Sequence, residues 1–324
     1  MTGMGRGVFR LAPFPFSVFR DMMVHHSTRK AVGAVTKQRR ADLLLVLVTA
    51  CWGMSYYLTD RCLEAGMTPM GLNAFRFLSA FALLAAVFFP RLRRISRATL
   101  KYSLFVGLAL SGTYVFYGYG ITRTSLSNAG FICALPVVFT PLLDFLFRGT
   151  RLKRKLLLAM ALCTFGLALL TLNESFRPRL GDLLCLGVAL CYAIDLLITE
   201  KAVRQPEVDP LALGVCQLGV VGLITLALSL LFETPRLPST PFTWGAALFL
   251  GIVCSGIAFV IQSVQQQYTT ASHVGLIFTL EPVFAAMVAF IAGERLRPLG
   301  YVGAVIMLAS LVLMEADWPK KKVE

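Results

Sequence analysis

The sequence contains one stretch twice. Thr124–Phe139 reads TSLSNAGFICALPVVF, and Thr269–Phe284 reads TTASHVGLIFTLEPVF. Both follow the pattern T-x-x-S-x-x-G-x-I-x-x-L-x-x-V-F. A shorter match, L-F-x-G-x-x-x-S-G, lies upstream of each stretch, at 104–112 and at 248–256. The chain therefore holds two copies of one unit, and the nature of that unit decides the fold.

The composition predicts a chain that lies in a membrane. It is 57% hydrophobic and 15% charged, with a mean hydropathy of +0.72, whereas soluble domains are about 25% charged. Crossing a bilayer takes roughly 20 helical residues, and backbone groups in lipid must be satisfied within the segment. We therefore expect ten transmembrane helices, near 42–60, 70–89, 100–121, 125–147, 154–173, 181–200, 210–232, 243–266, 270–292 and 298–315.

The distribution of basic residues predicts the orientation. Most of the Lys and Arg residues lie in segments that share one side of the membrane, including both tails and the loop RGTRLKRK at 148–155. By the positive-inside rule this side is cytoplasmic, in the plasma (inner) membrane. The net charge of +14 is then a matter of topology, and no nucleic-acid partner is expected. Residues 1–40 and 316–324 form basic cytoplasmic tails that flank the repeats at 41–173 and 179–315.

Counting the spans gives the relation between the two repeats. The matched stretches open the fourth and ninth expected spans, so that each repeat has five helices. Because five is odd, the second repeat begins on the opposite side of the membrane and must be inverted. Inverted repeats are typical of secondary transporters, whose two halves move about a site near the bilayer midplane. The fold class expected is thus all-α and polytopic, with two inverted five-helix repeats.

Several motifs resemble the drug/metabolite transporter superfamily, with two EamA-type repeats. They are Trp52-Gly53 in the first span, Arg76 in the second, and EPVF at 281–284 with GERL at 293–296 in and after the ninth. The similarity extends over about residues 41–315. The first repeat departs from it, because GTRL at 149–152 lacks the glutamate of GERL. The resemblance implies a carrier of small metabolites, often an exporter of amino acids or related compounds.

Three ionisable residues inside the expected spans are candidates for substrate contact, since charges in the bilayer are costly and usually functional. Glu281 lies near the midplane, where it could bind a proton or a substrate amine, or serve as a structural partner for Arg76. Arg76 could hold a substrate carboxylate bidentately, or extend to the interface. Asp195 is a candidate cavity-lining acid near the cytoplasmic side.

Uncharged polar and aromatic residues extend this candidate site. Trp52 and Tyr56 share one face of the first span because they are four residues apart. The repeat mates Asn128 and His273 differ between the copies, and His273 could either cap its helix or relay protons. The complete set expected to bind substrate is Trp52, Tyr56, Arg76, Tyr117, Asn128, Tyr192, Asp195, Gln262, Gln266, His273 and Glu281.

Prolines and small residues are expected to shape the helices. Pro136, Pro141 and Pro282 lie inside spans, where each removes a backbone hydrogen bond and either kinks the helix or frees a carbonyl for ligand. Small residues allow close helix packing in membranes. The duplicated small residues predicted to pack in this way are Gly107, Ser111 and Gly130, with their mates Gly251, Ser255 and Gly275.

The sequence thus predicts a secondary transporter that moves a small polar metabolite by alternating access, with protons as the candidate coupling ion. A carrier of nucleotide sugars, lipid-linked compounds or drugs from the same superfamily is the alternative. An intramembrane protease built on Ser111 and His273 is a weaker one, because the glycine that usually lies two places before the serine is missing. No metal or cofactor motif is present, and neither catalytic residues nor cofactors are expected.

Overall fold

The computed structural model describes residues 32–120, 123–124, 126–150, 152–171, 180–291 and 297–315. The chain divides into two compact units, Met1–Thr36 and Lys37–Glu324. The expected tails 1–40 and 316–324 lie mostly outside the described residues. Everything below concerns the second unit. Throughout the described part of the chain, every element of regular secondary structure is a helix.

Helices follow one another along the described part of the chain. Their bounds are α2 Val32–Glu64, α3 Pro69–Val87, α4 Phe89–Leu92, α5 Arg97–Gly120, α6 Leu126–Cys133, α7 Pro136–Arg148, α8 Arg154–Thr171, α9 Leu180–Val203, α10 Pro210–Phe232, α11 Pro241–Phe249, the π-helix η2 Leu250–Ile257, α12 Ala258–Gln265, the 3₁₀-helix η3 Gln266–Tyr268, α13 Ala271–Phe278, α14 Glu281–Ile291 and α15 Pro298–Glu315. We call the end of the bundle at the α2–α3 turn the Gly66 end, and the opposite end, where α7 stops, the Arg148 end.

The spans differ in how strongly they favour a membrane. Among the described residues, eight helical stretches are long and apolar enough to cross a bilayer, and Pro298–Met314 is a shorter apolar helix. The expected span in α5 is not among the eight, although α5 has 24 residues. Its tyrosines, Tyr114, Tyr117 and Tyr119, lower its hydropathy. Two of them, Tyr114 and Tyr117, line the cavity described below.

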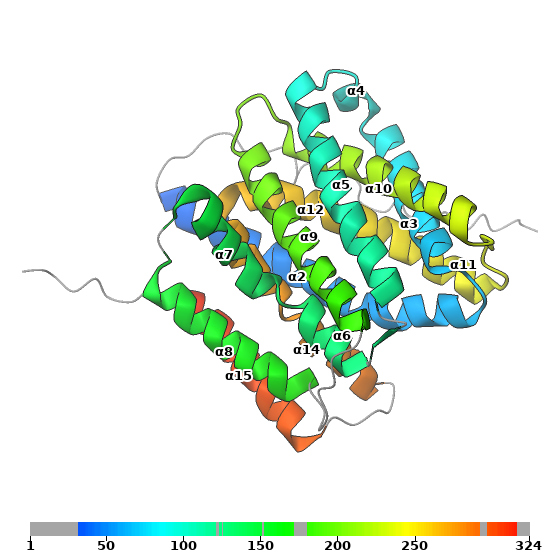
Figure 1. Ribbon diagram of the computed structural model, residues 1–324. Coiled ribbons are helices and arrows are strands. Elements are labelled where there is room, and N and C mark those ends of the chain that lie inside the picture. Colours follow the sequence, from blue (N-terminus) through cyan, green and yellow to red (C-terminus); the bar gives the residue numbers. More distant parts are fainter. Residues whose placement is uncertain are drawn as a thin grey trace, which may run out of the picture. The chain divides into compact units, whose positions relative to one another are not determined.

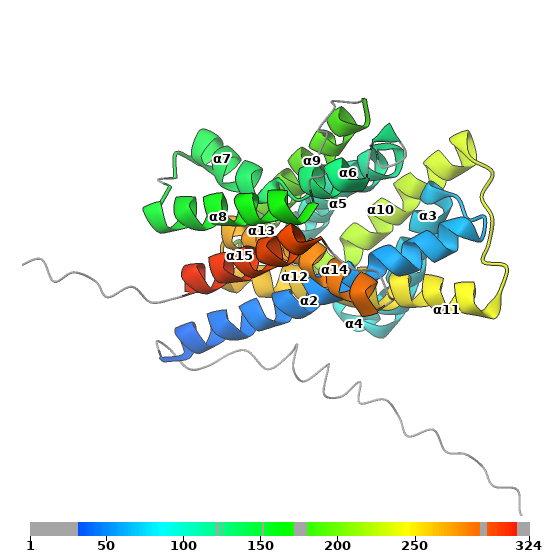
Figure 2. The same ribbon diagram turned by 90° about the horizontal axis from the view of Figure 1, so that it is seen from below.

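The packing of the helices follows the inverted repeat. The repeat mates α3 and α10 pack against each other, and so do α8 and α15, which lie side by side in Figures 1 and 2. Reciprocal contacts join α5 to α10 and η2 to α3. This chain is an all-α polytopic membrane protein built from two inverted five-helix repeats.

The fourth and ninth spans are each broken at the same place in the repeat. Turns at 134–135 and 279–280 separate α6 from α7 and α13 from α14. Pro136 is the first residue of α7, a position at which the missing amide hydrogen costs nothing. The Ile132 carbonyl, which the proline was expected to free, accepts a hydrogen bond from the Leu135 amide at 3.1 Å. Pro141 remains inside a continuous α7.

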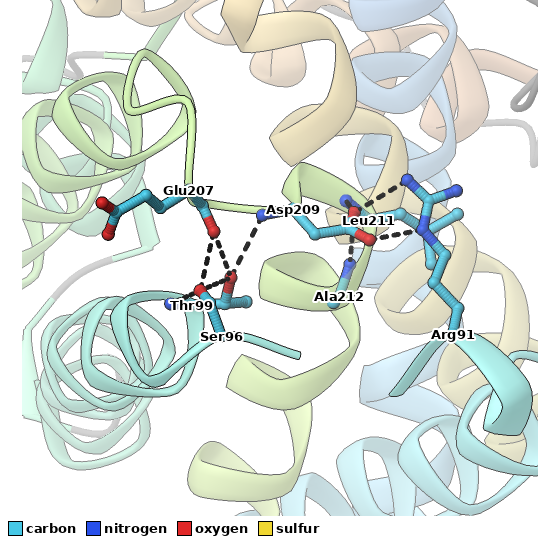
Figure 3. A network of polar contacts seen from close by, with 7 residues as sticks. All are labelled: Arg91, Ser96, Thr99, Glu207, Asp209, Leu211 and Ala212. Atoms are coloured by element: carbon cyan, nitrogen blue, oxygen red, sulfur yellow. Dashed lines mark hydrogen bonds and ion pairs between the residues drawn. The ribbon is translucent and has the colours of Figure 1, made fainter. Parts of the chain in front are cut away.

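Polar contacts tie the two repeats together at the Arg148 end. Arg91 forms a bidentate ion pair with Asp209, whose carboxylate also caps α10 by accepting from the amides of Leu211 and Ala212. Beside it, the hydroxyls of Ser96 and Thr99 donate to the Glu207 carbonyl, as Figure 3 shows.

At the Gly66 end the relation is reversed. Glu233, which ends α10, accepts hydrogen bonds from the amides of Met70 and Gly71 and so caps α3. The mates α3 and α10 are therefore joined directly at the Gly66 end, and at the Arg148 end through α4, which follows α3.

We expect Asp209→Ala to lower the free energy of unfolding by about 0.5–2 kcal/mol, the usual contribution of a helix N-cap. The Arg91 pair should add little, because the Arg91 side chain is 42% exposed and surface pairs are weak. Thermal unfolding of the purified protein in detergent measures the effect. Asp209→Asn keeps a capping oxygen and should behave nearly as the wild type. A loss from Arg91→Ala as large as that from Asp209→Ala would show that the ion pair, and not the cap, is the stabilising element.

Candidate functional site

A cavity lies among the helices, between the middle of the bundle and the Gly66 end. The volume of the cavity is about 150 Å³. At the Gly66 end its wall reaches Leu63 on α2, Pro69 on α3 and Gly118 on α5. The breaks in the fourth and ninth spans also open onto it, through Pro136 and Pro282. Both repeats therefore contribute to one central site.

Arg76 is the cationic group of this wall. It lies on α3 and is only 4% exposed. Its Nε donates to the Ser255 hydroxyl at 3.2 Å, and its guanidinium carbon lies 5.8 Å from the Tyr114 ring centre. Among the described residues, no carboxylate lies within ion-pair distance of Arg76. Its terminal nitrogens can therefore bind an anion that enters the cavity.

The π-helix η2 positions Arg76. π-Helical segments are rare and occur frequently at functional sites. Within η2, Ser255 donates to the Leu250 carbonyl at 3.0 Å while it accepts from Arg76. Gly251 lets α3 approach closely, since a Cβ there would lie 2.9 Å from the Arg76 carbonyl oxygen. The mate of Ser255, Ser111, lies in the regular helix α5 and donates to the Gly107 carbonyl of its own helix.

Glu281 is the anionic group of the same wall. It is the first residue of α14, where a helix N-terminus favours a negative charge. The Tyr56 side chain interacts with its carboxyl. Glu281 and Arg76 form no ion pair with each other, although both line the cavity. The wall thus brings one basic and one acidic side chain to the same cavity.

Aromatic rings close the cavity toward the Arg148 end. The Trp52 ring lies 5.2 Å from Phe259, 4.8 Å from Phe278 and 6.3 Å from Tyr192, measured between ring centres. Its indole nitrogen donates to the Cys254 carbonyl at 2.7 Å, which fixes the ring. We refer to Trp52, Tyr192, Phe259 and Phe278 as the aromatic floor. It can stack against the apolar part of a ligand.

The structure divides the residues singled out from the sequence into two groups. Those on the cavity wall are Trp52, Tyr56, Arg76, Tyr117, Tyr192 and Glu281, together with Gly130, Gly275, Pro136 and Pro282. The buried residues Asp195, Gln262, Gln266 and His273 do not line the cavity but lie beyond its floor. Asn128 is in α6, and its side chain lies outside the described residues.

The small residues also separate into two kinds. A Cβ on Gly107 would lie 2.6 Å from the Val220 Cβ, so that this glycine allows α5 and α10 to pack closely. Gly130 and Gly275, which were expected at helix interfaces too, have only ordinary contacts at 3.6 Å. They form part of the cavity wall instead. Their absent side chains leave room for a ligand.

Sequence reasoning missed several residues of the wall. These are Ser55, Thr59, Asn73, Thr113, Phe259, Phe278 and Thr279. Asn73 could have been found, because it lies three residues before Arg76 and so shares its helix face. Phe259 and Phe278 could not, since a phenylalanine in a membrane helix carries no signal of its own.

The architecture has counterparts of known structure. One crystal structure of a protein superposes with a TM-score of 0.72 at 19% sequence identity, covering 85% of this chain and 96% of its own. At this identity the likeness concerns the fold alone.

Curated relatives resemble the chain over most of its length. An uncharacterized transporter of Archaeoglobus fulgidus is 25% identical over 279 residues, covering 86% of each chain. A biotin transporter of Escherichia coli is 24% identical over 278 residues, or 83% of this chain and 91% of its own. A biotin transporter of Salmonella typhimurium is 22% identical over 275 residues, with the same coverage. The model of the EamA-like transporter family matches residues 39–172 and 179–315, so both repeats show that this chain belongs to the EamA-like transporter family.

Proposed function

We propose that this transporter carries a small zwitterionic metabolite, an amino acid or a related compound, and that the central cavity is its binding site. The proposal is carried by Arg76 and Glu281, which line one cavity and are not paired with each other. A carboxylate of the substrate would bind Arg76, and its ammonium group would bind Glu281. Two opposite charges within the bilayer are costly. A ligand that neutralises both offsets this cost.

The aromatic floor supports a substrate that also has an apolar part. Tyr56, Tyr117 and Tyr192 add hydroxyls to the wall, so that the cavity is amphipathic rather than purely charged. We place both termini in the cytoplasm and the transporter in the plasma membrane, on the strength of the basic residues in the tails and in the loop after α7. A fluorescent protein fused to the C-terminus would then fluoresce, and a phosphatase that matures only outside the cytoplasm would be inactive there.

In this orientation the Gly66 end faces outward. The cavity, whose wall reaches that end, then belongs to the state that is accessible from outside. Alternating access would open the same site toward the Arg148 end. The proposed direction is export.

A biotin-like monocarboxylate is the second candidate, because two relatives are named biotin transporters. Such a ligand has a carboxylate for Arg76 but no ammonium group for Glu281. The two candidates therefore differ at one residue of the site.

Glu281→Gln separates them. For a zwitterionic amino acid we expect the substitution to weaken binding about ten- to a hundredfold, because a hydrogen bond between charged groups is replaced by a neutral one. Biotin should bind the variant and the wild type equally. The measurement is ligand-dependent thermal stabilisation with amino acids, biotin and nucleotide sugars, followed by counterflow of the ligand that binds into liposomes.

Matched controls fix the interpretation. Ser55→Ala alters a polar group of the wall without touching a charge and should change affinity only slightly. Stabilisation by nucleotide sugars alone would overturn the proposed substrate class. If amino acids bind with Glu281→Gln unaltered in affinity, the role of this carboxylate is excluded and the transport function is not.

A further inference from the structure

A second polar site lies beyond the aromatic floor. Asp195 follows Tyr192 by one turn of α9 toward the Arg148 end. It is 1% exposed, and it is not part of the cavity wall. On the facing helix α12, Gln262 is also 1% exposed and donates its Nε2 to Asp195 Oδ2 at 3.4 Å. A carboxyl group is thus enclosed in the middle of the protein, separate from the substrate site.

The groups around Asp195 have unused hydrogen-bonding capacity. Its Oδ1 atom has no partner, and neither do Gln262 Oε1, the Tyr192 hydroxyl or the Thr199 hydroxyl. Tyr192, Asp195 and Thr199 share one face of α9 because three and four residues separate them. Buried polar groups are nearly always satisfied in native proteins. A cluster of unsatisfied ones around a carboxyl group points to something that they bind.

No positive charge balances Asp195. The titratable side chains that interact with it are Tyr114 on α5 and Cys191 and Tyr192 on α9. Among the basic side chains on neighbouring helices, Arg97 and Lys101 of α5 are exposed. Arg148 of α7 pairs with Asp144 and Glu200, and His273 Nε2 of α13 lies 3.2 Å from Asp42 Oδ1. In the described part of the chain, no basic side chain is within ion-pair distance of Asp195. An isolated carboxylate in such surroundings is unfavourable, whereas a carboxylic acid is tolerated.

The geometry favours a proton over a metal ion. Among the described residues, no group of three or more His, Cys, Asp and Glu side chains is placed to hold a metal. The contact of 3.4 Å from Gln262 is longer than the 2.7–3.2 Å usual for an N–H···O hydrogen bond. A protonated Asp195 gains an O–H group, which the unpartnered Gln262 amide oxygen can accept. We propose that Asp195 is the proton-binding group of this transporter, in a polar layer that the aromatic floor separates from the substrate cavity.

The polar layer continues toward the Arg148 end and away from the cavity. Gln266, one turn beyond Gln262, donates to the Leu196 carbonyl at 2.6 Å, and its own amide oxygen has no partner. His273 and Asp42 follow at the start of α13 and near the start of the span in α2. The polar layer therefore extends from Asp195 toward the Arg148 end, whereas the cavity lies on the other side of the floor, toward the Gly66 end. That proton binding is coupled to substrate transport rests on the proposed function. That Asp195 binds a proton does not depend on it.

Infrared difference spectroscopy on the full-length protein in liposomes tests the inference without any substrate. Across a pH titration, the carbonyl stretch of a buried carboxylic acid should appear as pH falls and vanish as pH rises. In Asp195→Asn this band should be absent. In Gln262→Leu, which removes its hydrogen-bond partner, the band should remain at a shifted frequency. Glu281→Gln should retain it unchanged.

The controls keep the test decisive. Asp195→Glu preserves a titratable carboxyl at the same place, so a band shifted from that of the wild type is expected even if Asp195→Asn folds poorly. Gel filtration and thermal unfolding establish that each variant is intact. A band that persists in Asp195→Asn and is lost in Glu281→Gln would overturn the inference. It would assign the proton to the cavity carboxylate instead.

Exchange of potassium for sodium at constant pH distinguishes the proton from an alkali cation. No change in the band is expected, and its loss on addition of sodium would replace the proton site by a sodium site. If liposomes show no transport of any tested ligand, the infrared result still stands. If they show transport and Asp195 does not titrate, this inference fails and the proposed function remains.

Discussion

Gly303→Ala is expected to separate α8 from α15 and to lower the free energy of unfolding by about 1–3 kcal/mol, the usual cost of overpacking. A Cβ at this position would lie 2.4 Å from the Gly166 carbonyl oxygen and 2.7 Å from the Leu170 amide nitrogen. Both are backbone atoms, which cannot rotate away. Because these helices are repeat mates that rely on each other's contact, Gly303→Leu should abolish the folded protein. Yield and thermal unfolding in detergent measure both effects.

Gly245→Ala is the matched control. Gly245 also lies within a helix, α11, but a Cβ there meets nothing within 4 Å. This variant should be neutral or more stable by up to about 1 kcal/mol, because alanine favours a helix more than glycine does. Equal losses in Gly245→Ala and Gly303→Ala would mean that helix packing is not what requires the glycine.

Arg76→Lys is expected to weaken binding of a carboxylate ligand about ten- to a hundredfold, although the charge is kept. Lysine cannot present the planar fork that holds a carboxylate with two hydrogen bonds. It also loses the Nε–H that Ser255 accepts, which fixes the guanidinium against Tyr114. Thermal stabilisation and counterflow with the ligand identified in the screen measure the loss. Arg76→Ala should be weaker still.

An analogue of the ligand isolates the cause. If the carboxylate is converted to an amide, the analogue should bind the wild type and Arg76→Lys with similar, low affinity. Ser255→Ala removes only the hydroxyl that positions Arg76. Its affinity for the carboxylate ligand should lie between those of the wild type and Arg76→Lys. If Arg76→Lys weakens binding of the amide analogue as much as it weakens binding of the parent ligand, then Arg76 supports the shape of the cavity and does not bind the carboxylate.

The sequence was sufficient for the fold because duplication and hydropathy are global signals. The repeated stretches beginning at Thr124 and Thr269 required two equal units, and the count of spans then required inversion. The breaks at 134–135 and 279–280 were harder to foresee. A proline in a span predicts a disturbance, but whether the helix bends or stops depends on neighbouring helices. Pro136 begins a new helix, whereas Pro141 is accommodated inside one.

The candidate site was only partly accessible to sequence reasoning. Arg76 and Glu281 stand out because charges in a membrane span are rare. Polarity alone could not say on which side of the aromatic floor a residue lies, so Asp195 and Gln262 were grouped with the cavity residues. The π-helix at 250–257 left no sequence signal, since its first-repeat mate has a similar pattern and forms a regular helix. The side of the floor on which a residue lies, and whether a segment forms an α- or a π-helix, both depend on packing between segments that are distant in the sequence.

The π-helix also has a thermodynamic consequence. In a carrier made of inverted halves, the inward-open and outward-open conformations have equal free energy only if each half can adopt the conformation of the other. Here Ser255 of the second repeat accepts from Arg76 of the first, while its mate Ser111 is occupied within its own helix. The protein without substrate would then be mostly open to one side of the membrane. The substrate concentration that half-saturates transport would differ between the two sides. The gradient at which net flux stops is unaffected by this inequality, because an equilibrium does not depend on the protein that catalyses it.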